Sequence, residues 1–197
     1  MAKFAVTITL TEPILGTAPL NKELYAEYIA TKMPDNGDAS DEIETVEEMT
    51  EKGTTGFHRD ASGSPILYDY VIKGFCKDAA GMLRRIEGTK SSKLTAYKKI
   101  IDGLVFVRPR TIPIVSSAGI GILERPLRAQ TAQGERVALS RSEMIQAGAT
   151  ITFALDLLDA KLEPAVREWL DYGSLRGLGQ WRNGGYGTFT YTMDAVV

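Results

Sequence analysis

Residues 177–189 read GLGQWRNGGYGTF, and glycine makes up five of the first eleven positions. Glycine lets the backbone adopt positive φ angles and lie close against a partner. Between the glycines stand two aromatic rings and an arginine, which are groups that stack on bases and contact phosphates. The stretch therefore predicts a nucleic-acid surface made by the glycines Gly177, Gly179, Gly184, Gly185 and Gly187 and by the side chains of Gln180, Trp181, Arg182 and Tyr186.

Two common nucleotide-binding loops do not fit this stretch. The dinucleotide fingerprint places Gly-x-Gly-x-x-Gly between a strand and a following helix. Here Arg182 stands at the third glycine position, and we expect a helix before the loop and a strand after it. A phosphate-binding P-loop ends in Gly-Lys-Ser or Gly-Lys-Thr, whereas this loop ends in Tyr186-Gly187-Thr188. The remaining alternative is an ordinary glycine-rich surface turn with an exposed tryptophan.

The bulk composition is that of one globular domain. The chain has 197 residues, of which 44% are apolar and 24% charged, so we expect a single domain over residues 1–197. It contains no apolar run of about 18 residues and no signal-peptide pattern at its start, so we expect no membrane partner. The single cysteine, Cys76, excludes an internal disulfide and suits a reducing cytoplasm.

The charges are distributed unevenly, although the net charge is only −2. Residues 35–52 carry eight acidic residues and one lysine, and they define an acidic insertion at about residues 34–52. Residues 73–110 carry ten basic and three acidic residues. This asymmetry indicates a face for a polyanion. The alternative is two solvated surfaces without a partner.

The pattern of apolar residues predicts a mixed α+β fold. Residues 3–11 alternate apolar and polar side chains, which is typical of a half-buried strand. The clearest helix covers residues 69–86, where apolar residues recur at helical spacing. Several strands in succession between the helices favour a mainly antiparallel sheet. The other expected elements are a short helix over residues 21–33, strands within residues 57–67, 104–115, 137–141, 150–158 and 188–193, and a helix over residues 164–172.

Cations on the helix at residues 69–86 line up along one side. At about 100° per residue, Lys73, Lys77 and Arg84 fall within roughly 40° of one another. Such a ridge can follow a phosphate backbone, although lysines on a solvated helix face are equally common. We expect these three side chains, together with Arg125 and Arg128, to contact phosphates.

The residues needed for catalysis are nearly absent. His58 is the only histidine, which excludes a metal site made of several histidines. Cys76 belongs to the apolar stripe of its helix and fits a small core residue better than a nucleophile. We therefore expect a binding protein with no metal and no cofactor, and His58 is the one weak candidate for a catalytic residue.

The order of motifs along the chain resembles the RAMP superfamily of CRISPR-associated proteins. It is most similar to the backbone subunits of type III effector complexes, which polymerise along a guide RNA. The resemblance covers most of the chain outside residues 21–56. It rests on the opening strand and glycine turn at residues 4–16, on Arg59-Asp60 with Pro65-Ile66-Leu67 and Ile72-Lys73-Gly74, on the strand entry at residues 147–153, and on the glycine-rich loop with its Asn183-Gly184-Gly185-Tyr186-Gly187.

This resemblance implies a ferredoxin-like (RRM-like) antiparallel sheet core with helical insertions and a C-terminal glycine-rich loop. It also implies that Lys73 and its neighbouring cations contact a nucleic-acid backbone and that copies assemble side by side. The sequence departs from the cleaving members of the family, which carry an aspartate in the region that corresponds to residues 53–56. These four residues here are Gly-Thr-Thr-Gly, so we expect a protein without backbone-cleaving activity.

Several functions stay open at this point. The main hypothesis is a non-catalytic protein that assembles along RNA or single-stranded DNA as a filament or ring. A second is a single-stranded DNA-binding protein of phage or mobile-element replication or recombination. A third is a metal-independent endoribonuclease with His58 as general base. A fourth is an inhibitor or interaction protein whose acidic residues 35–51 mimic nucleic acid.

Overall fold

The computed structural model describes residues 1–20, 54–131 and 134–196, and for residues 127–131 and 134–139 it describes the backbone alone. The helix predicted over residues 21–33 and the acidic insertion predicted at about residues 34–52 lie outside the described residues. The prediction of a single domain over residues 1–197 stays a prediction.

Strand β1 (Ala2–Leu10) lies inside the larger sheet, next to its edge strand. It pairs on one side with β11 (Thr150–Leu157) and on the other with β12 (Phe189–Ala195), and both pairings are antiparallel. Strand β11 also pairs with β7 (Val105–Arg108) and β8 (Thr111–Val115), again in antiparallel fashion. The first strand of the chain is therefore enclosed by two strands from its last quarter.

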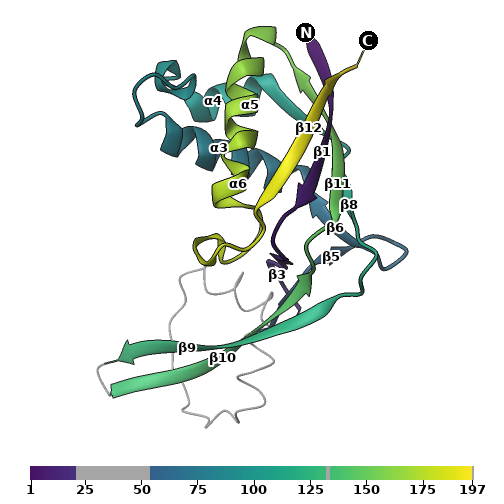
Figure 1. Cartoon of the computed structure of the whole chain (residues 1–197), viewed down its shortest axis with the longest axis vertical. Coiled ribbons are helices and arrows are strands. Elements are labelled where there is room, and N and C mark those ends of the chain that lie inside the picture. The colour runs from purple at the N-terminus through teal and green to yellow at the C-terminus, as the bar shows by residue number, and fades with distance from the viewer. Residues whose placement is uncertain (21–53, 132–133, 197) are drawn as a thin grey trace, which may run out of the picture.

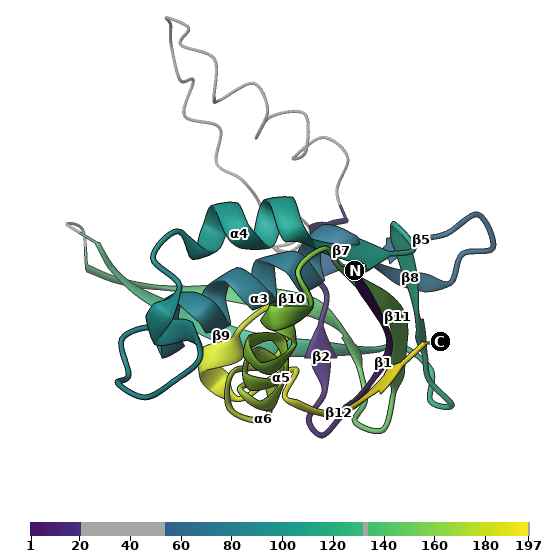
Figure 2. The same ribbon diagram turned by 90° about the horizontal axis from the view of Figure 1, so that it is seen from above.

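Two helices cross over between these strands and cover one face of the sheet (Figure 1, Figure 2). Helix α3 (Asp69–Leu83) lies between β1 and β7 in the sequence, and α5 (Glu163–Asp171) lies between β11 and β12. With the spatial order β12-β1-β11-β7, this is the β-α-β-β-α-β arrangement of a ferredoxin-like core. The predicted α+β class, ferredoxin-like core and mainly antiparallel sheet are confirmed.

The remaining elements extend this core. The larger sheet continues through β6 (Pro65–Tyr68) to β5 (His58–Arg59). A smaller sheet contains β2 (Ile14–Leu15), β3 (Ala18–Pro19), β4 (Thr54–Gly56), β9 (Gly121–Thr131) and β10 (Gly134–Ile145). The shorter helices are η1 (Ser91–Lys93), α4 (Tyr97–Leu104), η2 (Ala160–Leu162), α6 (Gly173–Arg176) and η3 (Arg182–Gly184).

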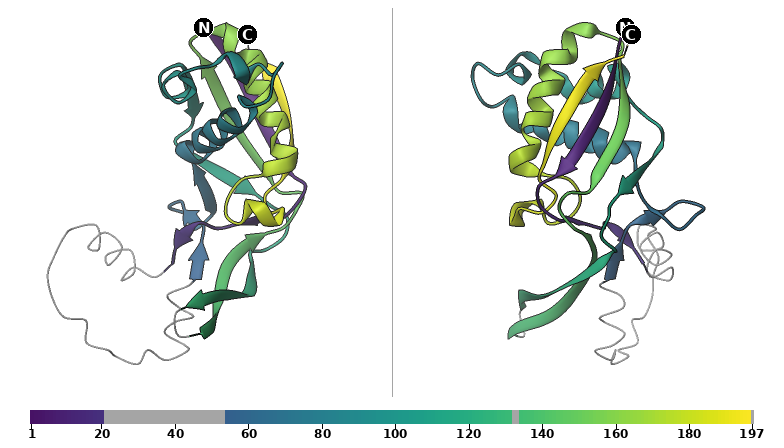
Figure 3. Two further views of the ribbon diagram at one scale, coloured as in Figure 1. Left: turned by 90° about the vertical axis from the view of Figure 1, so that its left-hand side faces the viewer. Right: turned by 45° about the vertical axis from the view of Figure 1, so that its right-hand side comes forward.

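Strands β9 and β10 form a long antiparallel ribbon that leaves the body of the molecule (Figure 1, Figure 3). The pairing runs continuously from Gly134 opposite Thr131 to Met144 opposite Gly121. The sequence predicts a strand only over residues 137–141 of this segment. Outside residues 137–141, large apolar residues do not recur at every second position of this segment, so its sequence lacks the alternation that reveals a half-buried strand.

The core lies between the helices and the sheet. Alternate residues of β1 and β11 point into it, and α3 contributes the apolar stripe expected from the sequence. Cys76 is part of that stripe and is 1% exposed, and its burial raises the pKa of the thiol to about 12. The interpretation of Cys76 as a core residue is confirmed. Among the described helices, none is long and apolar enough to cross a membrane.

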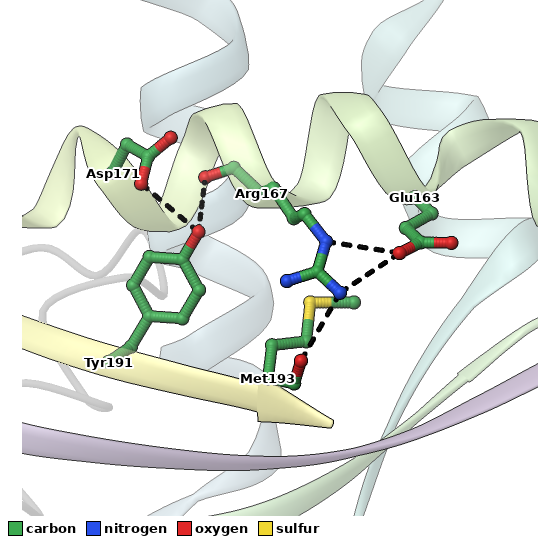
Figure 4. Close-up of polar contacts among 5 residues, drawn as sticks. All are labelled: Glu163, Arg167, Asp171, Tyr191 and Met193. Atoms are coloured by element: carbon green, nitrogen blue, oxygen red, sulfur yellow. Dashed lines mark hydrogen bonds and ion pairs between the residues drawn. The ribbon is translucent and has the colours of Figure 1, made fainter. Parts of the chain in front are cut away.

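Helix α5 is fastened to the edge strand β12 by a polar cluster (Figure 4). Arg167 donates two hydrogen bonds to Glu163 Oε1, at 3.0 and 2.9 Å, and one to the Met193 carbonyl oxygen at 3.2 Å. The Tyr191 hydroxyl oxygen lies 3.0 Å from Asp171 Oδ1 and 3.2 Å from the Arg167 carbonyl oxygen. The cluster satisfies a carbonyl group on the free edge of the sheet, which would otherwise be open to pairing with another strand.

The Tyr191 hydroxyl gives this cluster a pH dependence. Partial burial, followed by the hydrogen bond to Asp171 and its negative charge, raises the pKa of Tyr191 from 10.0 to about 12. The folded state therefore keeps a proton that the unfolded state releases. The resulting stabilisation is complete below pH 10 and is lost as the pH rises from 10 to 12. We expect urea unfolding between pH 9 and 11.5 to show a steeper alkaline loss of stability in the wild type than in Tyr191→Phe; equal slopes would contradict the assignment.

Two helical glycines form a matched test of the packing. A Cβ at Gly173, the first residue of α6, would overlap the ring of buried Phe189, whereas a Cβ at Gly74 in α3 would meet nothing within 4 Å. We expect Gly173→Ala to lower the free energy of unfolding by about 1–3 kcal/mol through overpacking. We expect Gly74→Ala to raise it by about 0.5–1 kcal/mol through helix propensity. Chemical denaturation measures both, and the same sign for both variants would contradict the packing described.

Candidate nucleic-acid interface

The glycine loop, residues 177–187, is closed at its neck by backbone hydrogen bonds. It connects α6 to β12, and the Leu178 amide donates to the Gly187 carbonyl oxygen at 2.8 Å. The Gly187 amide in turn donates to the Pro13 carbonyl oxygen at 2.8 Å, just after β1. Gly187 has a φ of +72°, and a Cβ there would overlap the Leu178 carbonyl oxygen. Only glycine satisfies both constraints.

Trp181 occupies an unfavourable backbone conformation at the tip of this loop. Its φ and ψ of 54° and 39° lie in the left-handed region, and it is the one described non-glycine residue with a positive φ. Such a conformation costs about 1–3 kcal/mol. The indole packs against Gly184, where a Cβ would come within 3.1 Å of the ring. Strain of this kind persists where neighbouring contacts compensate for it, and it is common at binding sites.

Those neighbouring contacts come from Tyr186 and Arg125. The Tyr186 ring is stacked with Trp181 at a centroid distance of 5.2 Å and an interplanar angle of 14°. The Arg125 guanidinium carbon, from strand β9, lies 3.7 Å from the centre of the Trp181 ring. The structure thus brings together three predicted site residues from distant segments of the chain. We refer to Arg125, Trp181 and Tyr186 as the loop stack.

Two nitrogen atoms of Arg125 have no hydrogen-bond partner within the described part of the chain. They are Nε and Nη1, and both are inaccessible to solvent. Loss of solvation lowers the pKa of the guanidinium, and the nearby Tyr186 opposes that shift. A desolvated cation without a carboxylate is stabilised when an anion approaches. Arg125 therefore makes the loop stack a favourable place for a phosphate.

A cavity of about 600 Å³ opens beside the loop stack. Its lining includes Tyr186 and Gly185 from the loop, Leu123 from the base of the ribbon, and the polar side chains of Glu12 and Gln146. Small-molecule and base-binding pockets have volumes in this range and combine apolar walls with a few polar groups. The cavity is large enough to hold an unpaired base against the Tyr186 ring.

Arg182, in contrast, is used to hold the loop in place. Asp78 Oδ2 on α3 accepts hydrogen bonds from Arg182 Nη1 at 2.9 Å and from Arg176 Nε at 3.0 Å. Arg176 Nη1 also donates to Asn183 Oδ1 at 2.5 Å. The predicted binding role of Arg182 stays a prediction, but its charge is already paired with Asp78 in this structure.

Gln180 anchors the loop to the smaller sheet. Its Oε1 accepts hydrogen bonds from Thr55 Oγ1 at 3.0 Å and from Ser142 Oγ at 3.2 Å. The two hydroxyls lie 2.9 Å apart on the parallel pair β4 and β10. The sequence predicts Gln180 as a nucleic-acid-binding residue. In the structure its side chain holds the loop against the smaller sheet.

The predicted basic ridge on α3 lies beside α4, with Arg84 exposed to solvent. Lys73 Nζ donates to the Asp102 carbonyl oxygen at 3.2 Å, and Lys77 Nζ forms an ion pair with Asp102 Oδ1 at 2.6 Å. Arg84 lies over the Tyr97 ring at 5.3 Å. Helix geometry alone aligns the three cations, and the position of α4 beside them supplies their partners. For Arg128 the side chain lies outside the described residues.

His58 makes an edge-to-face ring contact with Tyr68 at 4.9 Å. Within the parts of the chain that the structure describes, no hydrogen bond or ion pair to its imidazole is found, so no described group orients it as a general base. The same residues contain no group of three His, Cys, Asp or Glu side chains close enough to share a metal ion. The endoribonuclease reading of His58 stays a hypothesis.

The face of the sheet opposite the helices carries no ring on its central strands. Where side chains of β1, β11 and β12 point away from the core, the described residues are mostly threonine, with Thr7, Thr152 and Thr192 among them. Thr7 Oγ1 lies 3.1 Å from Thr152 Oγ1. RRM proteins stack bases on aromatic residues at this face. The sheet has the RRM-like topology but lacks that stacking platform.

The fold and the loop together define an α+β protein with an RRM-like core and a glycine-rich loop beside it. No protein-family model matches the sequence, and no curated protein matches it either. Among solved structures, the chain is similar to a chain of type III-B Cmr-beta, solved by cryo-EM bound to cognate target RNA, with a TM-score of 0.57 and 13% identity. It is also similar to a chain of a type IV-B CRISPR complex, with a TM-score of 0.50 and 12% identity.

These likenesses concern the fold. Both cover 99% of this chain, and they cover 60% of the Cmr-beta chain and 91% of the type IV-B chain. The protein therefore spans about three fifths of the length of the first of these relatives. The fold predicted from the order of motifs is confirmed, because chains of these two CRISPR complexes share it.

The anchoring of the glycine loop by Asp78 can be tested directly. We expect Asp78→Ala to release Arg176 and Arg182, to lower the free energy of unfolding by about 1 kcal/mol, and to speed amide hydrogen exchange at Leu178 and Gly187. Asp156→Ala is the matched control, because it removes a comparable pair with Arg108 far from the loop in the fold. Unchanged exchange at the loop amides in Asp78→Ala would show that the ion pairs do not hold the loop.

Proposed function

We propose that this protein is a non-catalytic single-stranded nucleic-acid-binding protein of the RAMP type. It contacts the nucleic-acid strand at the place where the glycine loop meets the base of the β9–β10 ribbon. The observation that carries this proposal is the loop stack, in which the near-parallel rings of Trp181 and Tyr186 lie beside the Arg125 guanidinium. Trp181 has a strained backbone, and two Arg125 nitrogen atoms have no hydrogen-bond partner among the described residues.

The chemistry of the loop stack favours a single strand over a duplex. Rings gain affinity by stacking on bases whose faces are free, and a duplex hides those faces. Trp181 is 44% exposed, and the cavity next to Tyr186 is wide enough for a base to extend the stack. A phosphate at the other end would face the Arg125 guanidinium, two of whose nitrogen atoms have no hydrogen-bond partner among the described residues. Stacking of this kind tolerates any base, so we expect little sequence preference.

RNA is the polymer we favour. The similar Cmr-beta chain belongs to a complex solved with cognate target RNA, and the shared fold makes an RNA strand the first candidate here. Single-stranded DNA, as in a protein of phage or mobile-element replication, is the competing choice, because stacking and phosphate contacts serve both polymers. Contacts to the 2′-hydroxyl would distinguish the two.

We further propose that copies assemble side by side on the strand as a filament or ring. The β9–β10 ribbon supports this, since it projects beyond the body of one copy (Figure 3). Exposed apolar residues at its base, Ile120 and Ile122, add surface that an adjacent copy would cover. Assembly predicts that the number of copies bound rises with strand length.

Fluorescence anisotropy with labelled 30-mers of single-stranded RNA, single-stranded DNA and duplex DNA tests the proposal at two salt concentrations. We expect salt-sensitive binding to a single strand and a loss of affinity of about 5- to 100-fold in Trp181→Ala, because base stacking on one ring is worth about 1–3 kcal/mol. Trp181→Phe should retain most of the affinity. Leu175→Ala is the matched control, since Leu175 is 75% exposed on the neighbouring helix α6.

Three outcomes would count against the proposal. Absence of binding to any strand at low salt would overturn it, and equal affinity of wild type and Trp181→Ala would remove the loop stack from the interface. Shortening of the RNA during the incubation, abolished by His58→Ala, would replace a binding protein with the endoribonuclease hypothesis.

A further inference from the structure

The cavity beside the loop stack is lined by Glu12 and Gln146 as well as by Tyr186. The Glu12 amide donates to the Thr188 carbonyl oxygen at 3.4 Å, which holds Glu12 beside the chain just after the glycine loop. Gln146 comes directly after β10, whose last two residues pair with β2, the strand that follows Glu12. Two polar residues from distant segments therefore line one cavity of about 600 Å³ together with an aromatic ring.

The rest of the lining suits a flat ring. Pro13, Leu123 and Met144 supply apolar surface. Trp181 stacks on one face of the Tyr186 ring but does not line the cavity, so the cavity reaches that ring away from Trp181. Apolar walls with a few polar groups are typical of a pocket that orients a small aromatic ligand. The polar groups then decide which ligand it is.

The polar groups of Glu12 and Gln146 are not used by the fold. Both residues are exposed, and within the described part of the chain neither the carboxylate nor the carboxamide has a hydrogen-bond or ion-pair partner. By contrast, the Asp78 carboxylate, which also lies at the glycine loop, is paired with Arg176 and Arg182. A carboxylate at a surface for phosphates repels the strand. Glu12 therefore lowers affinity unless it accepts hydrogen bonds from a base.

A carboxylate selects among bases by the donors on their edges, because it offers two acceptor oxygens and no donor. The Watson–Crick edge of guanine presents two adjacent donors, N1–H and N2–H, which match the two oxygens. Uracil presents one N–H between two carbonyl oxygens, which repel a carboxylate. Adenine and cytosine each present one amino group beside an acceptor nitrogen. In a single strand these edges are free, so Glu12 favours guanine. The Gln146 carboxamide has N–H donors that suit guanine O6.

We propose that the cavity binds one guanine of the strand, with its ring against Tyr186, its N1–H and N2–H donating to Glu12, and its O6 accepting from Gln146. The proposal rests on the proposed function and adds a specificity-determining residue, Glu12, to the same site. The loop stack tolerates any base. The preference therefore applies only to the nucleotide that enters the cavity.

Short strands with one variable position test the guanine contact. Fluorescence anisotropy measures the binding of labelled uridine 12-mers whose central base is guanine, adenine, cytosine, uracil or hypoxanthine. We expect the guanine strand to bind about 5- to 150-fold more tightly than the all-uridine strand, which is the discrimination that a bidentate pair provides. Hypoxanthine lacks the 2-amino group of guanine and should lose most of this preference.

The variant Glu12→Gln gives the decisive comparison. It keeps the size of the side chain but replaces one acceptor with a donor, so the preference for guanine over uracil should fall to about twofold or less. Affinity for the all-uridine strand should stay the same or rise, because a negative charge is removed. Glu87→Gln is the matched control, since Glu87 is exposed and does not line the cavity. It should keep the guanine preference.

The possible results separate the guanine contact from the proposed function. If Trp181→Ala weakens every 12-mer but the wild type shows no preference, or prefers another base, the loop stack stands and the guanine contact is refuted. A guanine preference that survives in Glu12→Gln refutes it as well. Displacement of the strand by micromolar guanosine monophosphate would show a pocket for a free nucleotide in place of a strand contact. Absence of any strand binding by the wild type overturns both proposals.

Discussion

The antiparallel pairing of β1 with both β11 and β12 is the constraint on which the rest of the molecule depends. It joins the first ten residues of the chain to two strands near its end, over eight residue pairs on one side and seven on the other. Because β1 is enclosed, the chain that leaves it must run past the start of β12. The Thr11 and Gly187 amides then donate to Thr188 and Pro13 across this junction. The glycine loop is held at the end of β1 for this reason.

The glycine loop contacts three separate parts of the fold. Arg182 connects it to α3 through Asp78, Gln180 connects it to the smaller sheet, and Trp181 connects it to the ribbon through Arg125. Neighbouring residues in the sequence thus have different roles, since two of them hold the loop and one presents a ring. A loop fixed on three sides loses little conformational entropy when it binds a ligand, which is the usual advantage of preorganisation.

The fold also shows how an RRM-like sheet can lack the stacking face of an RRM. Threonines replace rings on the central strands, so the open face offers hydroxyls and methyl groups. Rings gather at two other places. Trp181 and Tyr186 stack in the glycine loop, and His58, Tyr68 and Tyr70 contact one another at the β5–β6 end of the sheet. Topology therefore sets where elements lie, and the side chains at exposed positions set what the protein can bind.

The sequence by itself determined the elements whose period is imposed by a core. The strands of residues 3–11 and 150–158 and the helices of residues 69–86 and 164–172 all match observed elements, because one face of each is buried and the hydrophobic pattern records it. It also determined that residues 177–187 form a glycine-rich loop, since the close backbone contact at Gly187 admits no side chain.

Only the tertiary structure decided which of the predicted binding residues act together. Arg125 meets Trp181 because the base of the ribbon lies beside the loop, and the pairing of Lys77 with Asp102 depends on where α4 packs. The ribbon itself and the ring contacts among His58, Tyr68 and Tyr70 leave no periodic signal in the sequence. Contacts between distant segments depend on how elements pack in space, and a local pattern of residues carries no record of that packing.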